Sequence, residues 1–427
     1  MGSEMKCSTS LTLFVTKDNA QNGTASRRRV IMANDESCKK YGVPVYGAAW
    51  VPPGAIRSAP KPPPEGDGDD KDAADKSPPI ASHNYVVMAG GGGEGNSGIP
   101  NAILLARFDF DSNFLSDLPV ARLGTGSDLP YRMTVHPGGE GLICSLPKSC
   151  SWFEWDAGSD TDDGALSVKS SERLLKQLED VGQQLALTFN NEGSLLAVGG
   201  EDGKLRVFKW PSMEIIIDEA NAHSCVKDLD FSPDGKFLVS AGSGPCRVWN
   251  VSTSASVASL QKENDEVLGF CRFSRSSDNN QALYATAMQG KGGSIVKWST
   301  ASWNRMSSKW VSRDPISAFN VSADGKLLAI GTIQGDVLIL SSNLRVLTTV
   351  KKAHLGLVTT LKFSDDSRAL LSTSLDSSVR VTVIKDKSNE KGFNMWIILL
   401  ILLMAIAVYY ANREGKLSLP FDFPIKF

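Results

Sequence analysis

A repeating unit of about forty residues occupies the middle of the chain, between residues 185 and 381. Each copy contains an alternating apolar run, a polar turn such as Pro-Asp-Gly, a second apolar run and a third run that often ends in Trp. Large apolar residues hold one place in successive copies, at separations of 42, 42, 48 and 42 residues: Phe189, Phe231, Phe273, Val321 and Phe363. Alternation predicts strands, the triplets predict tight turns, and this period predicts four-stranded blades of a WD-type β-propeller.

Two weaker units precede the five clear ones. They cover residues 131–155 and residues 44–108, and they bring the total to seven. We therefore expect an all-β fold, a seven-bladed WD-type β-propeller over residues 44–384. Its last blade would be completed by N-terminal strands, so that no sheet edge stays open.

Two segments outside the repeats are predicted to lack a core. Residues 1–43 are polar and are expected to form a flexible N-terminal arm. Residues 52–82 form an insertion in the first blade, and it is rich in proline and charge. Such a composition buries too little apolar surface to offset the entropy of ordering, so we expect the insertion to be disordered.

The C-terminal region contains seventeen consecutive uncharged residues, 395–411. As a helix this stretch would cover roughly 26 Å, which suits the thinner bilayer of the endoplasmic reticulum. We expect a single transmembrane helix, preceded by a linker at 385–394 and followed by a short lumenal tail at 412–427. The propeller would then face the cytosol.

Composition argues against several classes of function. The formal net charge of −2 provides no general attraction for nucleic acid, so no nucleic-acid partner is expected. Seven scattered cysteines without a CxxC pair suggest neither a disulfide framework nor a zinc site, and a reducing compartment fits best.

The polar residues of the repeats are predicted to be structural. His223 and His354 precede inner strands, where WD repeats place a histidine that hydrogen-bonds within the blade. Asp234, Asp324 and Asp365 are expected to stabilise turns. Because no nucleophile, histidine and acid form a recognisable set, we predict neither an enzyme with covalent chemistry nor a side-chain metal site.

A glycine-rich loop interrupts the first unit. The run Tyr85–Ala89 enters four consecutive glycines, and a second apolar run leaves at residues 102–108, which reads as strand, loop, strand over residues 90–101. Residues 93–98 match GxGxxG, but a dinucleotide site needs a helix next, and Pro100 with a β-type run follows instead. The lysine strand and catalytic triplets of a kinase are also missing.

The loop sequence GGGGEGNSGIPN, together with the repeats and the apolar C-terminal stretch, resembles one family. These are the membrane-anchored WD-repeat exchange factors of the endoplasmic reticulum that load GTP onto the small GTPase Sar and so start the coat-protein-complex-II vesicle coat. Relatives include prolactin regulatory element-binding protein and the phosphate transporter traffic facilitators. The resemblance implies a guanine-nucleotide exchange factor at the endoplasmic reticulum membrane with the Sar GTPase as its partner.

The same resemblance assigns roles within the loop. It implies a potassium ion held largely through loop oxygens, in the part of the loop formed by Gly90, Gly91, Gly92, Gly93, Glu94, Gly95, Asn96, Ser97 and Gly98. It implies contact with the GTPase and nucleotide exchange through Ile99, Pro100 and Asn101. The alternative is a non-catalytic module that helps a membrane cargo, such as a phosphate transporter, leave the reticulum. A general WD scaffold at another membrane stays open as well.

Overall fold

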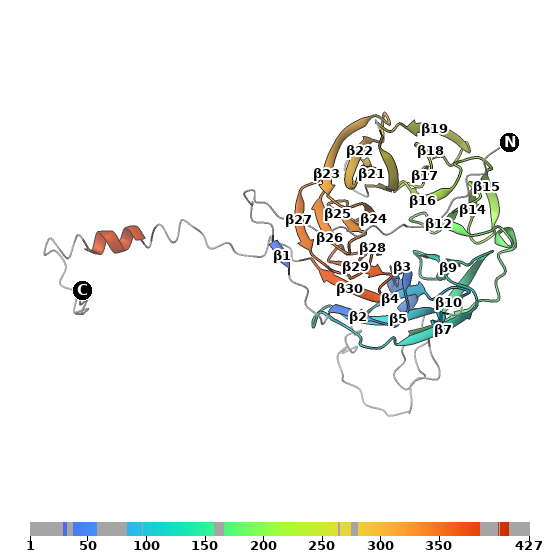
Figure 1. Cartoon of the computed structure of the whole chain (residues 1–427), viewed down its shortest axis with the longest axis horizontal. Helices are drawn as coiled ribbons and strands as arrows, with labels where there is room; N and C mark the ends of the chain where they lie inside the picture. The colour runs from blue at the N-terminus through green and yellow to red at the C-terminus, as the bar shows by residue number, and fades with distance from the viewer. Residues whose placement is uncertain are drawn as a thin grey trace, which may run out of the picture. The chain divides into compact units, whose positions relative to one another are not determined.

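Seven sheets surround a common axis in the part of the chain that the structure describes (Figure 1). The computed structural model describes residues 29–31, 37–57, 83–95, 97–157, 166–263, 265–274, 281–384, 400 and 402–409. Contacts divide the chain into two units, Met1–Val383 and Ile384–Phe427. The seven sheets are the blades of a propeller and belong to the first unit.

The blades follow one another in chain order. Blade 1 consists of β3 (Val45–Trp50), β4 (His83–Gly90), β5 (Asn101–Asp109), β6 (Phe114–Leu115) and β7 (Ala121–Gly126). Blade 2 consists of β8 (Arg132–Val135), β9 (Gly141–Ser145), β10 (Cys150–Ala157) and β11 (Leu166–Ser170). Blade 3 consists of β12 (Gln184–Phe189), β13 (Leu195–Gly200), β14 (Leu205–Lys209) and β15 (Glu214–Glu219). Blade 4 consists of β16 (Val226–Phe231), β17 (Phe237–Gly242), β18 (Cys246–Asn250) and β19 (Ala255–Leu260).

Blades 5, 6 and 7 follow, and blades 6 and 7 each include one strand from the N-terminal region. Blade 5 consists of β20 (Val267–Phe273), β21 (Ala282–Gln289), β22 (Gly292–Ser299) and β23 (Arg305–Ser312). Blade 6 consists of β24 (Ile316–Val321), β25 (Leu327–Thr332), β26 (Val337–Ser341) and β27 (Val346–Val350), with β1 (Arg29–Ile31) paired to β27. Blade 7 consists of β28 (Val358–Phe363), β29 (Ala369–Ser374) and β30 (Ser378–Val383), with β2 (Cys38–Lys40) paired to β30.

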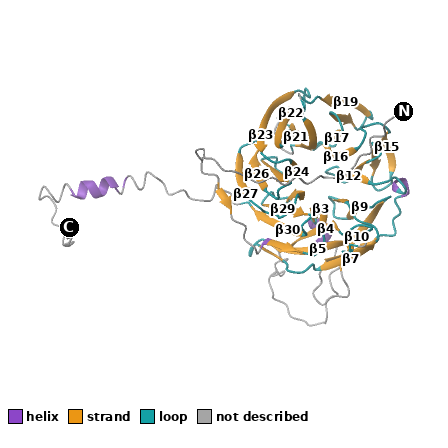
Figure 2. Ribbon diagram, viewed as in Figure 1, coloured by secondary structure: helices purple, strands orange, loops and turns teal. Residues whose placement is uncertain are grey.

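The ring closes through its innermost strands. Neighbouring inner strands contact one another in the cycle β3, β8, β12, β16, β20, β24, β28 and back to β3. Figure 2 shows that strands form nearly all the regular structure of this unit. The prediction of an all-β, seven-bladed propeller is confirmed.

The N-terminal region contributes a strand to each of two blades. β2 lies antiparallel to β30 and supplies the outer strand of blade 7, as expected for a closed ring. β1 lies parallel to β27 and adds a fifth strand to blade 6. The assignment of residues 1–43 to a flexible arm is therefore wrong for these two segments, because their backbone groups pair with open sheet edges.

The insertion begins with regular structure. α1 (Pro53–Arg57) forms where the sequence predicted the start of a disordered insertion at residue 52. Ala55 of this helix is 3 % exposed, and its burial accounts for the order of the first residues. The rest of the predicted insertion, residues 58–82, lies outside the described residues.

In the second unit, residues 402–409 are helical. Within the described ranges, no helix is both long and apolar enough to cross a membrane. The predicted linker at 385–394 and tail at 412–427, and the predicted span at 395–411 apart from 400 and 402–409, lie outside those ranges.

The predicted structural histidines do hydrogen-bond within their blades. His223 Nε2 lies 2.9 Å from Ser240 Oγ, to which Trp249 Nε1 also donates at 2.9 Å. His354 lies between two hydroxyls, with Nε2 2.8 Å from Ser372 Oγ and Nδ1 2.5 Å from Ser378 Oγ. A neutral imidazole donates from one nitrogen and accepts at the other, so both contacts of His354 are satisfied without a charge.

The three predicted turn aspartates, Asp234, Asp324 and Asp365, do lie in turns. Asp234 Oδ1 accepts from Ser232 Oγ at 2.7 Å and from the Lys236 N–H at 3.2 Å. Asp324 makes the same two contacts in blade 6. In blade 7 the corresponding contacts are made by Asp366, which lies two residues after Ser364, and Asp365 precedes it in the same turn.

Buried His354 makes the stability of the propeller depend on pH. Its side chain is 2 % exposed, and burial lowers its pKa to about 4, with Asp376 opposing and Arg380 adding to the decrease. An unfolded histidine has a pKa near 6.5, so between these values the unfolded chain binds the proton more strongly. The free energy of unfolding should therefore fall as the pH drops from about 6.5 to about 4, by up to roughly 3 kcal/mol.

Unfolding by urea across this pH range checks the expectation. The variant His354→Gln should be less stable at neutral pH but should show a shallower loss of stability from pH 6.5 to 4. Equal slopes in the two proteins would show that His354 is not the titrating group.

Candidate functional site

The glycine loop joins the second and third strands of blade 1. β4 ends at Gly90 and β5 begins at Asn101, and the base of the loop lies against the entry to β3. The N–H of Gly91 donates to the Pro44 carbonyl at 3.1 Å. A Cβ on Gly90 would lie 2.0 Å from the same oxygen, so only glycine permits this approach.

Asn101 is the internal anchor of the loop. It is 3 % exposed. Its Oδ1 accepts from the Gly93 N–H at 3.0 Å, and its Nδ2 lies 3.2 Å from the Gly93 carbonyl. The same Nδ2 lies 3.1 Å from the carbonyls of both Gly126 and Ser127. One side chain thus connects the loop to the end of β7.

A second set of close contacts shapes the loop around this anchor. A Cβ on Gly91 would lie 2.2 Å from Asn101 Oδ1, so any side chain there would displace the anchor. Ser97 Oγ lies 3.5 Å from the Gly92 carbonyl and accepts from the Ile99 N–H at 3.3 Å. The loop therefore folds back on itself and presents its far side to solvent.

The outward surface is formed by the second half of the loop. Pro100 is exposed, and Ile99, at 36 %, is among the large exposed apolar residues of the propeller. Together with residues 93–95, Gly98, Gly126 and Ser127 they line an open hollow of about 500 Å³. Ile99 and Pro100 are therefore accessible from solvent at the rim of this hollow.

The structure brings the predicted site residues together but gives them different positions. Gly90 to Gly93 form the base, and Glu94, Gly95, Ser97 and Gly98 lie on the exposed side of the loop. Asn96 lies outside the described residues. Ile99 and Pro100 are accessible to a partner, whereas the side chain of Asn101 is turned inward, where it holds the loop.

Sequence reasoning missed Gly126 and Ser127. These residues reach the loop because β7 pairs with β5, which sets Gly126 opposite Asn101. The only sequence signal is the run Gly124-Thr125-Gly126-Ser127 at the end of a strand, and it reads as an ordinary turn.

The donor set around Asn101 suits a cation that prefers oxygen. Three carbonyl oxygens, those of Gly93, Gly126 and Ser127, lie within hydrogen-bonding distance of Asn101 Nδ2. An amide nitrogen carries only two hydrogens, so Asn101 cannot donate a separate hydrogen to each of the three oxygens. Neutral oxygen ligands of this kind suit hard cations. Elsewhere in the described ranges, no three or more His, Cys, Asp or Glu side chains are placed to hold a metal ion.

Two WD-repeat family models and a solved structure match this chain. Residues 187–301 match the family model "Anaphase-promoting complex subunit 4 WD40 domain", and residues 345–382 match "WD domain, G-beta repeat". The crystal structure of Raptor from Chaetomium thermophilum superposes with a TM-score of 0.58 at 12 % identity, over 82 % of this chain and 28 % of that one. At that identity the likeness shows the fold alone.

Two relatives give the family. The chain is 52 % identical over 357 residues to SEC12-like protein 2 of Arabidopsis thaliana, which covers 83 % of this chain and 90 % of the relative. It is 23 % identical over 384 residues to the guanine nucleotide-exchange factor SEC12 of Rattus norvegicus, which covers 76 % of this chain and 90 % of that protein. With its seven WD-type blades and this extent of identity, the chain belongs to the SEC12-like family of WD-repeat proteins.

Proposed function

We propose that this protein is a guanine-nucleotide exchange factor for a small GTPase of the Sar type, and that it promotes coat-protein-complex-II vesicle formation at the endoplasmic reticulum. Relatives named as SEC12 exchange factors support the activity. The structural observation that supports it most strongly is the exposed Ile99–Pro100 tip on a loop braced from inside by Asn101.

Exchange of this kind requires binding energy rather than covalent chemistry. A protein that binds the nucleotide-free GTPase more tightly than the GDP-bound form lowers the barrier to GDP release. Ile99 offers apolar surface for that contact, and Pro100 has a fixed φ, so little conformational entropy is lost on binding. Asn101 acts as a positioning residue, because its four contacts set the height and angle of the tip.

A potassium ion is the proposed cofactor of the loop. Among the described residues, Gly93, Gly126 and Ser127 have the carbonyl oxygens best placed to hold the potassium ion. When bound, the ion would neutralise the mutual repulsion of these oxygens. Binding only to the folded loop would favour its ordered form by mass action.

Attachment to the membrane is proposed through residues 395–411. Leu402, Leu403 and Met404 of the helical segment 402–409 are more than half exposed. Exposed apolar side chains of this kind are consistent with a nonpolar environment and support the proposal. Single-pass insertion would leave the propeller in the cytosol, where a Sar GTPase is accessible.

Two variants distinguish a residue that contacts the GTPase from a residue that positions the loop. Release of a fluorescent GDP analogue from a Sar GTPase should be accelerated by the full chain in mild detergent. Ile99→Ala should slow the accelerated rate about threefold, because Ile99 is 36 % exposed and burying that part contributes only about a third of the roughly 1.5–3 kcal/mol for full burial. Asn101→Ala should slow it at least as much and, in addition, abolish the hydrogen-exchange protection of the Gly93 N–H.

Leu118→Ala is the matched control. Leu118 is 77 % exposed and does not line the hollow, so its removal should change neither measurement. Intact Gly93 protection in Asn101→Ala would contradict the positioning role. A wild-type chain that does not accelerate release would refute exchange activity and favour the alternative, an exit factor for a membrane cargo.

Replacement of potassium tests the cofactor. At constant ionic strength, choline in place of potassium should reduce hydrogen-exchange protection in residues 90–101 and slow nucleotide release. Asn101→Ala, which disorders the same oxygens, should make both measurements insensitive to the cation. Identical protection of the loop in the two salts would eliminate the potassium proposal.

Alkaline carbonate extraction tests the membrane segment. The full chain expressed in cells should stay in the membrane pellet and localise to the endoplasmic reticulum, and a chain ending at residue 394 should be released. A glycosylation sequon placed in residues 412–427 should be modified if this tail is lumenal. Release of the full chain by carbonate would contradict a transmembrane segment.

A further inference from the structure

A hollow of about 280 Å³ lies at the seam between blade 5 and blade 6, far along the ring from the glycine loop of blade 1. Its lining comes from the two outer strands of blade 5, β22 and β23, and from the turn that joins β26 to β27. Pockets for drug-sized ligands measure about 300–1,000 Å³, so this hollow suits a small group.

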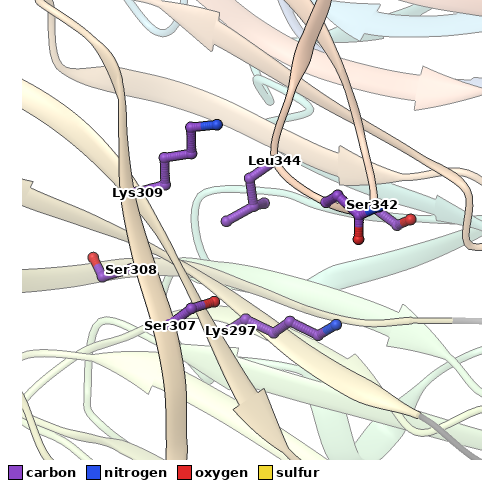
Figure 3. Close-up of a pocket in the computed structure, with 7 residues that line it drawn as sticks. Lys297, Ser307, Ser308, Lys309, Ser342 and Leu344 are labelled. Atoms are coloured by element: carbon purple, nitrogen blue, oxygen red, sulfur yellow. The ribbon is translucent and has the colours of Figure 1, made fainter.

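Strand register places two lysines on the face toward blade 6. Ile295 of β22 belongs to the apolar cluster shared with blade 6, and Lys297 lies two residues further along the same face. Across the ladder, Lys297 is paired with Ser307 and Ile295 with Lys309. Figure 3 shows both lysine side chains extending from their strands toward the turn that carries Ser342 and Leu344.

The turn on the opposite side of the hollow is well anchored. Leu344 is 4 % exposed and inserts into the apolar cluster between the blades. The Ser342 carbonyl accepts from Tyr284 Oη at 3.1 Å. Tyr284 also lies beneath Lys297, whose Nζ is 5.8 Å from the ring centroid. These contacts hold the turn in place, so that Ser342 and Asn343 line the hollow together with the lysines.

The charge of the hollow is positive and uncompensated. No Asp or Glu lines it, and within the described ranges neither lysine has a carboxylate within 4.0 Å. Two ammonium groups and several hydroxyls facing one small space form a donor set for an anion with several oxygens.

We propose that this seam hollow binds a phosphate monoester. At neutral pH a phosphate monoester carries a charge of about −1.5 to −2 and presents three strong acceptor oxygens. Lys297 and Lys309 supply the charge complement, and the hydroxyls of Ser307 and Ser342 supply neutral donors. A carboxylate has one charge and two oxygens, and it leaves part of this donor set unused.

Either a lipid headgroup or free phosphate can supply such a monoester, and titration with both kinds of probe distinguishes these two sources. The proposal is independent of exchange activity, because the hollow shares no residue with the glycine loop.

Calorimetric titration of the full chain in neutral detergent tests the site. The probes are inorganic phosphate, glycerol 3-phosphate and a short-chain phosphatidic acid, with acetate as a charge control. Phosphate should bind with a dissociation constant on the order of 1 mM, and the phosphatidic acid should bind about tenfold more tightly if the headgroup is the natural source. Lys297→Gln and Lys309→Gln should each weaken binding about tenfold.

Lys236→Gln is the matched control, since Lys236 lies on a turn of blade 4 and its side chain is 74 % exposed. This variant should bind all probes as the wild type does. Equal affinity of phosphate and phosphatidic acid would retain the site and assign it to free phosphate. Absence of binding by every phosphate probe, or binding that both blade 5 variants leave unchanged, would overturn the proposal.

Discussion

Closure of the ring is the constraint on which the rest of the structure depends. Each inner strand has a paired neighbour on only one side, and side chains of the adjacent blade satisfy groups on the other edge in several seams. Between blades 4 and 5 the carboxylate of Asp228 accepts from the Cys271 N–H at 2.9 Å and pairs with the Arg272 guanidinium. Asp230 accepts from the Phe273 N–H at 2.7 Å in the same seam.

The final seam joins residues that are far apart in the sequence. Thr359 Oγ1 donates to the Val45 carbonyl at 2.8 Å, and Trp50 Nε1 donates to the Lys362 carbonyl at 3.1 Å. These contacts hold the inner strand of blade 1 in place. The glycine loop rests on the residue just before that strand, through the bond from Gly91 to Pro44. Ring closure therefore determines the base on which the proposed exchange loop stands.

The two proposed binding regions are built on different physical principles. The loop of blade 1 uses a buried amide to orient an exposed apolar tip, which suits recognition of a protein surface. The hollow between blades 5 and 6 instead contains two lysines that have no carboxylate partner among the residues the structure describes, which suits an anion. Because blades 5 and 6 are not neighbours of blade 1, one region can be altered without disturbing the other.

The sequence by itself determined the blade architecture, the position of the glycine loop and the histidines that hydrogen-bond within blades. Alternation and turn triplets act over a few residues, so a single chain reveals them. Tertiary structure decided which side of the loop Asn101 faces, because its partners Gly126 and Ser127 reach it only through pairing of β5 with β7. It also placed Lys297 opposite Ser342, since side-chain neighbours across a seam depend on strand register and on closure of the ring.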